Sequence, residues 1–147
     1  MPGTMNVSTD QAPSPAGHYV QARRAGDHLY ISGQLPTRPD GRPLADDSFE
    51  TQAGQAIDNL MAVLKAAGGS PDDLARVTAY IVGVGNWPRF NQIYAARLGE
   101  ARPARTVVPV SELHYGYLVE VDAIAVIAEE PTATQAAKPV NMTVNES

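Results

Sequence analysis

Apolar residues recur with the period of an α-helix in one long segment of the chain. The stripe has 3.6-residue spacing and predicts a helix with one buried face; it consists of Phe49, Ala53, Ala56 or Ile57, Leu60 and Leu64. Asp47, with Glu50 three residues later, is the predicted N-cap, and Gly68-Gly69 ends the helix. A second, shorter helix is predicted from about Asn86 to Gly99.

Short runs rich in β-branched and aromatic residues predict the strands, which are expected at 19–22, 29–31, 74–82, 106–110 and 118–127. The first two form a hairpin that turns at Ala25-Gly26-Asp27. The last is apolar on both faces, which is typical of a strand in the centre of a sheet. The order ββαβαββ predicts an α+β fold in which two helices cover one face of the sheet.

The two ends of the chain differ in composition from its middle. Residues 1–15 and 131–147 are rich in Pro, Thr, Ser, Asn and Gln and show no sustained apolar period, so both are expected to be flexible tails. One folded domain is then expected over residues 16–130, a size that suits a single hydrophobic core.

Composition narrows the class of protein further. The chain has 147 residues, 44% of them hydrophobic, and no cysteine, which excludes disulfides, thiolate nucleophiles and cysteine-based metal sites. The formal net charge of −5 argues against nucleic acid as the main partner, because proteins that contact phosphates usually carry excess Lys and Arg. With no signal peptide and no membrane-spanning apolar run in the sequence, the expected location is the cytoplasm.

The three histidines do not form a metal-binding pattern. His18, His28 and His114 lie far apart, without the two- or four-residue spacing that brings ligands together on a strand or a helix. We therefore predict no metal site.

Two carboxylates in the last predicted strand are candidates for chemistry. Glu120 and Asp122 point to the same face, because side chains along a strand alternate with a period of two. Charged residues are seldom buried without a partner, so this face is either solvated at that end or carries acids that pair with arginines. A carboxyl held instead in an apolar pocket would have a raised pKa and could transfer protons.

Arg105 is the candidate for binding an anionic group. Pro103 stiffens the entry to the strand, so Arg105 stands at a defined strand start. A guanidinium in a fixed position can hold a planar carboxylate through two parallel hydrogen bonds. The alternative is an arginine at the surface or in a salt bridge.

Several short segments form a series of motifs: Gly17-His18-Tyr19-Val20-Gln21-Ala22, Ile31-Ser32-Gly33-Gln34-Leu35-Pro36, Thr51-Gln52 with Asn59-Leu60, 77–81, 90–94, Pro103-Ala104-Arg105-Thr106-Val107 and 118–125. Their sequences and order resemble the G-P-Y-x-Q-A, S-G-Q-[IL]-P, P-A-R-[ST]-x-V and V-E-I-E-A-I-A signatures of the YjgF/RidA family of reactive-intermediate deaminases. The resemblance covers about residues 17–128, nearly the whole predicted domain.

The resemblance implies a chorismate-mutase-like α+β subunit with a mixed sheet, assembled as a homotrimer with active sites between subunits. It also implies an enzyme that needs no cofactor and hydrolyses reactive enamines and imines, such as 2-aminoacrylate, to 2-oxo acids and ammonia. Arg105 would then bind the substrate carboxylate, and Glu120 would position the attacking water and transfer protons. Tyr19 and Ser32 would line the pocket, and Trp87 would form an apolar wall.

The chain departs from the family pattern around the expected cleft. His18 replaces the usual Pro, Val107 stands where members often have Cys, and Leu113-His114-Tyr115-Gly116-Tyr117 replaces L-P-[KR]-[GD]-x. Three side chains of this segment are bulky or aromatic where the family's loop borders the cleft. We therefore expect Tyr115 to bind substrate and the pocket to suit a larger or aromatic imine of a specialised pathway.

Two other functions remain as alternatives. A trimer of the same fold could bind metabolites or act as a chaperone without catalysing a reaction. Endoribonuclease activity, attributed to some relatives, fits poorly with the net charge of −5 and the lack of interleaved basic and aromatic residues. Arg105 favours the deaminase, because relatives without this arginine tend to lose the reaction.

Overall fold

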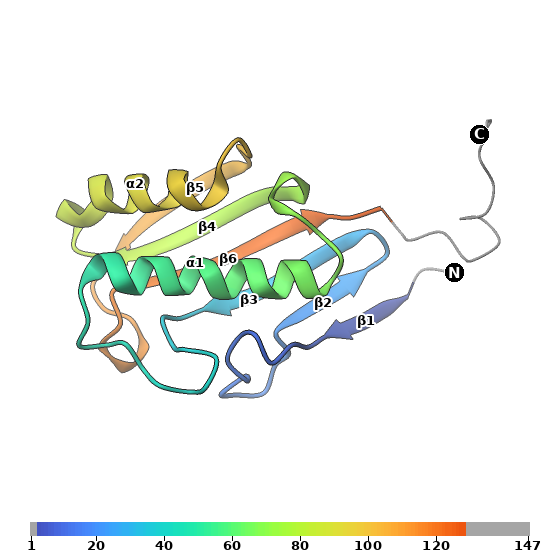
Figure 1. The fold of residues 1–147 in the computed structure, drawn as a ribbon, viewed down its shortest axis with the longest axis horizontal. Coiled ribbons are helices and arrows are strands. Elements are labelled where there is room, and N and C mark those ends of the chain that lie inside the picture. The colour runs from blue at the N-terminus through green and yellow to red at the C-terminus, as the bar shows by residue number, and fades with distance from the viewer. Residues whose placement is uncertain (1–2, 129–147) are drawn as a thin grey trace.

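The computed structural model describes residues 3–128, which fold into six strands, two α-helices and three short 3₁₀-helices (Figure 1). The strands are β1 (Thr4–Val7), β2 (Ala22–Ala25), β3 (His28–Gln34), β4 (Leu74–Val82), β5 (Ala104–Val110) and β6 (Val119–Val126). The helices are α1 (Phe49–Ala66) and α2 (Trp87–Leu98), with 3₁₀ turns η1 (Pro71–Asp73), η2 (Val84–Asn86) and η3 (His114–Gly116). The expected C-terminal tail, 131–147, lies outside the described residues.

The strands form one mixed sheet in the order β1-β2-β3-β6-β4-β5. Neighbours are antiparallel except β4 and β5, which are parallel because α2 carries the chain back between them. β6 lies between β3 and β4, so the expected central position of the last strand is confirmed. The predicted α+β class and mixed sheet are confirmed as well.

The expected N-terminal tail is wrong for Thr4–Val7, which forms β1 at the edge of the sheet. This strand pairs antiparallel with β2 along its whole length. Thr4-Met5-Asn6-Val7 alternates polar and apolar residues, but four residues within a polar segment are too short a run to distinguish a strand from a tail. Further along, Ala12 is buried in the core and anchors the segment that follows β1.

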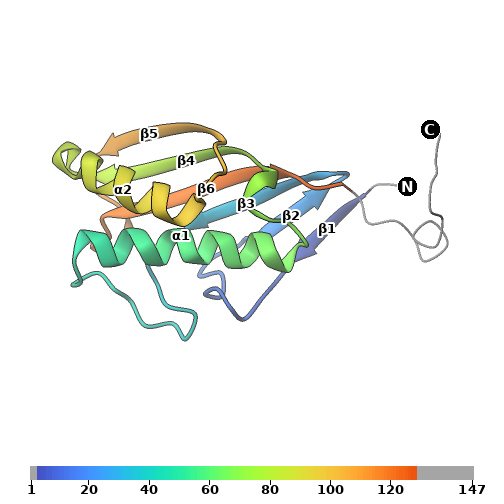
Figure 2. The same cartoon turned by 45° about the horizontal axis from the view of Figure 1, so that its top comes forward.

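Both helices cover the same face of the sheet, as Figures 1 and 2 show. Alternate residues of β6 are buried on this side: Val119, Val121, Ala123 and Ala125. Glu120 and Asp122 point to the other side, on which the described chain places no helix, and which we call the open face. Tyr30 and Val126 also belong to the open face and are 47% and 40% exposed.

The predicted apolar stripe of α1 is confirmed, because every one of its residues is buried. The predicted cap is off by one residue. The N-cap is Ser48 rather than Asp47, since the Ser48 hydroxyl accepts a 3.1 Å hydrogen bond from the backbone N–H of Thr51. Beyond the last turn, Gly68 adopts a φ of 89°, which lets the chain leave the helix.

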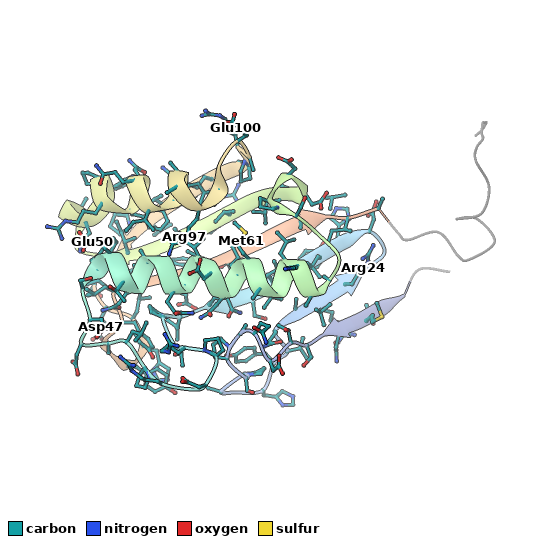
Figure 3. The ribbon with its side chains drawn as sticks, viewed as in Figure 1. Arg24, Asp47, Glu50, Met61, Arg97 and Glu100 are labelled. Carbon is teal, nitrogen blue, oxygen red and sulfur yellow. The ribbon has the colours of Figure 1, made fainter. Side chains whose placement is uncertain are left out.

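A charged pair joins α1 and α2 at their outer surface. Arg97 of α2 donates hydrogen bonds of 2.9 and 3.4 Å to the Asp58 carboxylate of α1, and Figure 3 shows Arg97 between the two helices. A Cβ at Gly54 would lie 2.6 Å from Nη2 of this guanidinium. The glycine therefore permits the approach of Arg97 to α1.

Three buried amide side chains, those of Gln21, Gln52 and Asn59, hold the loops beside the sheet. Gln21 accepts a 2.7 Å hydrogen bond from the backbone N–H of Thr9 and donates bonds of 3.0 and 2.9 Å to the carbonyls of Thr9 and Pro13. The irregular segment 9–13 is thereby tied to the β2–β3 hairpin.

Gln52 and Asn59, both on α1, hold the loop between β3 and α1. Asn59 donates hydrogen bonds of 3.0 and 2.8 Å to the carbonyls of Leu35 and Thr37. Gln52 donates to carbonyls at the end of the same loop and accepts a 2.9 Å bond from the N–H of Leu118. One helix thus positions both this loop and the segment that enters β6.

Asn59→Ala is expected to lower the free energy of unfolding by about 1–3 kcal/mol, because two carbonyls would lose their donors while staying shielded from water. Chemical denaturation followed by circular dichroism measures this change. Lys65→Ala, on the exposed side of the same helix, is the matched control and should change the value by less than about 0.5 kcal/mol. An equal loss in both variants would contradict the role assigned to Asn59.

Candidate active site

A β-bulge in β3 positions the carboxylate of Glu120. Two residues of β3, Ser32 and Gly33, stand opposite the single residue Asp122 of β6. A methyl group at position 33 would overlap Oε2 of Glu120 and lie 3.1 Å from its Cδ. Gly33 therefore provides the space in which the acid lies.

The pKa of Glu120 is raised above its usual value of 4.5. The main cause is partial burial, which removes water from the charged form, and the charge of Asp122 raises the pKa further. His114 acts in the opposite direction, so the loop before β6 lies near this carboxyl. Arg105 is not among the groups that shift it. An acid with a raised pKa in a partly desolvated position suits proton transfer.

Asp122 belongs to a separate set of polar contacts on the open face. The Tyr80 hydroxyl donates a 3.4 Å hydrogen bond to Oδ2 of Asp122, and Arg76 donates a 2.8 Å bond to Thr106 on β5. Burial raises the pKa of Asp122, while the Tyr80 hydrogen bond and the Arg76 charge lower it. Glu120 receives no hydrogen bond from residues 3–128, which makes it the freer of the two acids.

A cleft of about 670 Å³ opens between the loops that the buried amides hold. Gly33 is one of its lining residues, so the cleft reaches the β3 bulge, although Glu120 itself is not a lining residue. Its walls are mostly apolar and include Pro13, Pro15, Pro39, Pro43, Tyr19 and Tyr115. Asp40 is the one charged residue that the described chain contributes to the lining. The cleft of one chain therefore presents no cation to an anionic ligand.

Tyr19 and Tyr115 line this cleft, as expected of pocket residues, but Ser32 does not. The Ser32 hydroxyl instead donates a 2.6 Å hydrogen bond to the carbonyl of Val20. This bond holds the segment that carries Tyr19, whose own side chain is half exposed. Ser32 thus supports the backbone of a segment that lines the cleft and does not itself line the cleft.

The loop 113–117 places a group of aromatic rings at the cleft. Tyr115 has a φ of 62°, a positive value that only glycines otherwise adopt among the described residues. Its ring centroid lies 3.7 Å from that of His114 and 5.9 Å from that of Tyr117, which it meets edge-on. Tyr117 is buried, and its hydroxyl forms a 2.7 Å hydrogen bond with Thr37.

Arg105 and Trp87 lie near the other edge of the sheet, on β5 and at the start of α2. Figure 1 shows these two elements next to each other. Arg105 pairs with Val77 in the β4–β5 ladder, and its guanidinium carbon lies 5.0 Å from the ring centroid of Tyr94 and 5.9 Å from that of Phe90. It forms no salt bridge within residues 3–128. Trp87 is the first residue of α2 and packs against the core.

Within one chain, the predicted catalytic residues therefore do not meet. Glu120 pairs with Tyr80 and points to the open face, whereas Arg105 points to the helix face. The alternation of side chains shows which residues of one strand share a face of the sheet. Only the pairing register between two strands shows whether a residue of one strand lies on the same face as a residue of the other. The role of Tyr80 has no sequence signal. Gly33 has one, since a glycine inside a strand marks a bulge or a close approach.

The described residues contain no group of three or more His, Asp or Glu side chains that could hold a metal ion. Neither of their α-helices is both long enough and apolar enough to cross a membrane.

Comparison with known proteins identifies the family. The family model described as endoribonuclease L-PSP matches residues 9–127. The chain belongs to the YjgF/RidA family. This confirms the resemblance that the motifs indicated.

Relatives of this YjgF/RidA protein match it over most of their own length. A RutC family protein of Pyrococcus horikoshii is 39% identical over 119 residues, which are 81% of this chain and 94% of that protein. The crystal structure of RidA from the Antarctic bacterium Psychrobacter sp. is 36% identical, with a TM-score of 0.80, over 84% of this chain and 99% of that one. The crystal structure of Escherichia coli TdcF with bound serine is 29% identical, with a TM-score of 0.79 and the same coverage.

The raised pKa of Glu120 predicts how the stability of this YjgF/RidA protein varies with pH. When a carboxyl has a higher pKa in the folded than in the unfolded state, its protonated form stabilises the fold at pH values below the unfolded-state pKa. This stabilisation is lost as the pH rises through the folded-state pKa. Glu120→Gln stays neutral, so it should raise the melting temperature at pH 7, and the gain should shrink as the pH falls through the raised pKa of Glu120 and be lost below about 4.5.

Thermal denaturation at a series of pH values measures the effect. Glu100→Gln is the control, because Figure 3 shows Glu100 pointing away from the fold, and a surface substitution of this kind should change stability little. A gain for Glu120→Gln that does not depend on pH would contradict the prediction.

Proposed function

We propose that the protein hydrolyses small enamines and imines that carry a carboxylate, releasing a 2-oxo acid and ammonia. The observation that carries this proposal is the Glu120 carboxyl, held over Gly33 beside the cleft with a raised pKa. Membership in the YjgF/RidA family supports the reaction type. The serine bound to E. coli TdcF supports a small ligand with a nitrogen and a carboxylate on the same carbon.

The reaction needs a positioned water and one acid–base group. Water attacks the electrophilic carbon of the C=N bond, and Glu120 takes a proton from it and passes a proton to the nitrogen. The C–N bond then breaks as the carbonyl forms, and ammonia leaves. One water is consumed and no electrons are exchanged, so Glu120 and a way of orienting the substrate are sufficient.

Arg105 of a neighbouring copy supplies that orientation in our proposal. Within one chain it lies on the helix face, and the cleft presents only Asp40 as a charged group. The rings of Tyr94 and Phe90 support its guanidinium at the edge of the sheet, where a second copy can approach. A carboxylate in one cleft would then accept two parallel hydrogen bonds from Arg105 of the next copy, with Trp87 of that copy as an apolar wall.

A closed ring of three copies is the assembly we propose. The open face leaves Tyr30 and Val126 exposed, and β5 has a free edge in the described chain. Contact between the β5 edge of one copy and the cleft of the next joins two different surfaces, and head-to-tail contacts of this kind close into rings. The family resemblance sets the number of copies at three.

Endoribonuclease activity, which the description of the family model names, receives no support from this geometry. The chain carries a net charge of −5, and the charged residue in the cleft lining is an aspartate, Asp40. Both features repel the phosphates of RNA.

Mixing two impaired variants tests whether each site combines residues of two copies. Arg105→Lys, whose ammonium cannot form the two parallel hydrogen bonds, and Glu120→Gln should each lose most activity. Co-assembly should restore roughly a quarter of wild-type activity, because that share of sites pairs an intact Arg105 with an intact Glu120. The readout is release of ammonia and 2-oxo acid from imines generated in situ. Mixed assemblies as inactive as the separate variants would contradict a site shared between copies.

Removing the proton-transferring group should affect turnover rather than binding. Glu120→Gln is expected to lower kcat by about 10²–10⁴-fold with little change in KM, because Arg105 still binds the carboxylate. Asp122→Asn on the same strand face is the control, and steady-state kinetics on the same imines compares the two. If Asp122→Asn abolishes turnover while Glu120→Gln leaves it intact, the wrong carboxylate has been assigned.

A further inference from the structure

We propose that Tyr115 determines substrate specificity, and that the preferred substrates are 2-imino acids, or their enamine tautomers, with an aromatic or large apolar side chain. This inference rests on the deaminase function proposed above and names its substrate class. The substrate side chain would lie in the cleft against the rings of Tyr115 and Tyr19.

The backbone of Tyr115 is the first observation. Its φ of 62° and ψ of 12° lie in the left-handed region, which is unfavourable for a residue with a Cβ. Six glycines of the described chain adopt positive φ, and Tyr115 is the one residue there that does so with a side chain. Its side chain is 59% exposed, so the fold gains little from burying the ring. A strained residue whose ring stays exposed points to a role outside folding.

The neighbours of Tyr115 are the second observation, because they hold its ring in one place. His114 packs against one side with ring centroids 3.7 Å apart, and Tyr117 meets the ring edge-on at 5.9 Å. Tyr117 is itself fixed by burial and by its hydrogen bond to Thr37. The ring of Tyr115 is thus positioned before any ligand arrives, which favours tight binding of a flat apolar group.

The cleft is the third observation. Its volume of about 670 Å³ is in the range of pockets that hold drug-sized ligands, and is far larger than a three-carbon acid requires. Prolines, Leu35 and the tyrosines make its wall mainly apolar. It also reaches Gly33, over which the Glu120 carboxyl lies. In this proposal the substrate places its C=N carbon at the Gly33 end of the cleft, next to the Glu120 carboxyl, and extends an apolar side chain toward Tyr115.

The experiment compares imines made in situ by an amino-acid oxidase from phenylalanine and from alanine, and measures the acceleration of each hydrolysis over its spontaneous rate. The wild type should act preferentially on the phenylalanine-derived imine. Tyr115→Gly should lower this preference about tenfold. It should not lower the melting temperature, because glycine adopts the left-handed region without strain. Tyr115→Phe, which keeps the ring, should retain most of the preference, and Glu100→Gln, at the surface, should behave as wild type.

The outcomes separate this inference from the proposed function. If the wild type hydrolyses both imines and Tyr115→Gly leaves their ratio unchanged, the specificity role is wrong while the deaminase proposal stands. A wild type that accelerates only the alanine-derived imine would likewise overturn the specificity role and leave the deaminase proposal intact. If it accelerates neither, the proposed function fails and this inference fails with it.

Discussion

The hydrogen bonds of three buried amides are the constraint on which the cleft depends. The loops that line it have little regular structure, so their backbone polar groups need partners from elsewhere. Gln21, Gln52 and Asn59 supply these partners from the core, and each amide would be costly to bury if its bonds were broken. The same hydrogen bonds therefore provide partners for the buried amides and hold the loops in place. This gives the three residues, which stand in the motifs, a structural role.

The two faces of the sheet impose the second constraint. The β3 bulge lets Gly33 make room for Glu120 on the open face, whereas the β4–β5 register turns Arg105 to the helix face. No side-chain movement within one chain exchanges these faces, because that would need a shift of register in the centre of the sheet. A reaction that used both residues would therefore need two copies of the chain.

Periodicity predicts the helices and the later strands of this fold well, places the first hairpin strand at 19–22 where the structure has Ala22–Ala25, and predicts the mutual arrangement of the elements poorly. The span expected at 74–82 is that of β4, and the apolar stripe of α1 is buried as expected, because both signals come from residues close together in sequence. β1 escapes prediction because four alternating residues in a polar segment are too few to mark an edge strand. Arg105 and Glu120 lie on opposite faces because of the pairing register between their strands. This register cannot be read from the sequence of either strand alone. Recognition of the family motifs proposes Arg105 and Glu120 as site residues without showing that they lie on opposite faces.

Local sequence rules and the observed structure disagree mainly beside the cleft. A bulge interrupts β3 there, a carboxyl with a raised pKa occupies a partly buried position on β6, and a tyrosine adopts a left-handed backbone conformation. Elsewhere the apolar stripe of α1 and the alternation along β6 agree with the fold, and Tyr115 beside the cleft is the one described residue with a side chain that has a positive φ. The bulge is explained by Glu120, which needs the space that Gly33 leaves. Tyr115 gains ring contacts with His114 and Tyr117 but stays 59% exposed, so the fold offsets its backbone strain only in part. In the proposed reaction a ligand that contacts both the acid and the ring would supply the rest, because its binding energy would be obtained only where both are present.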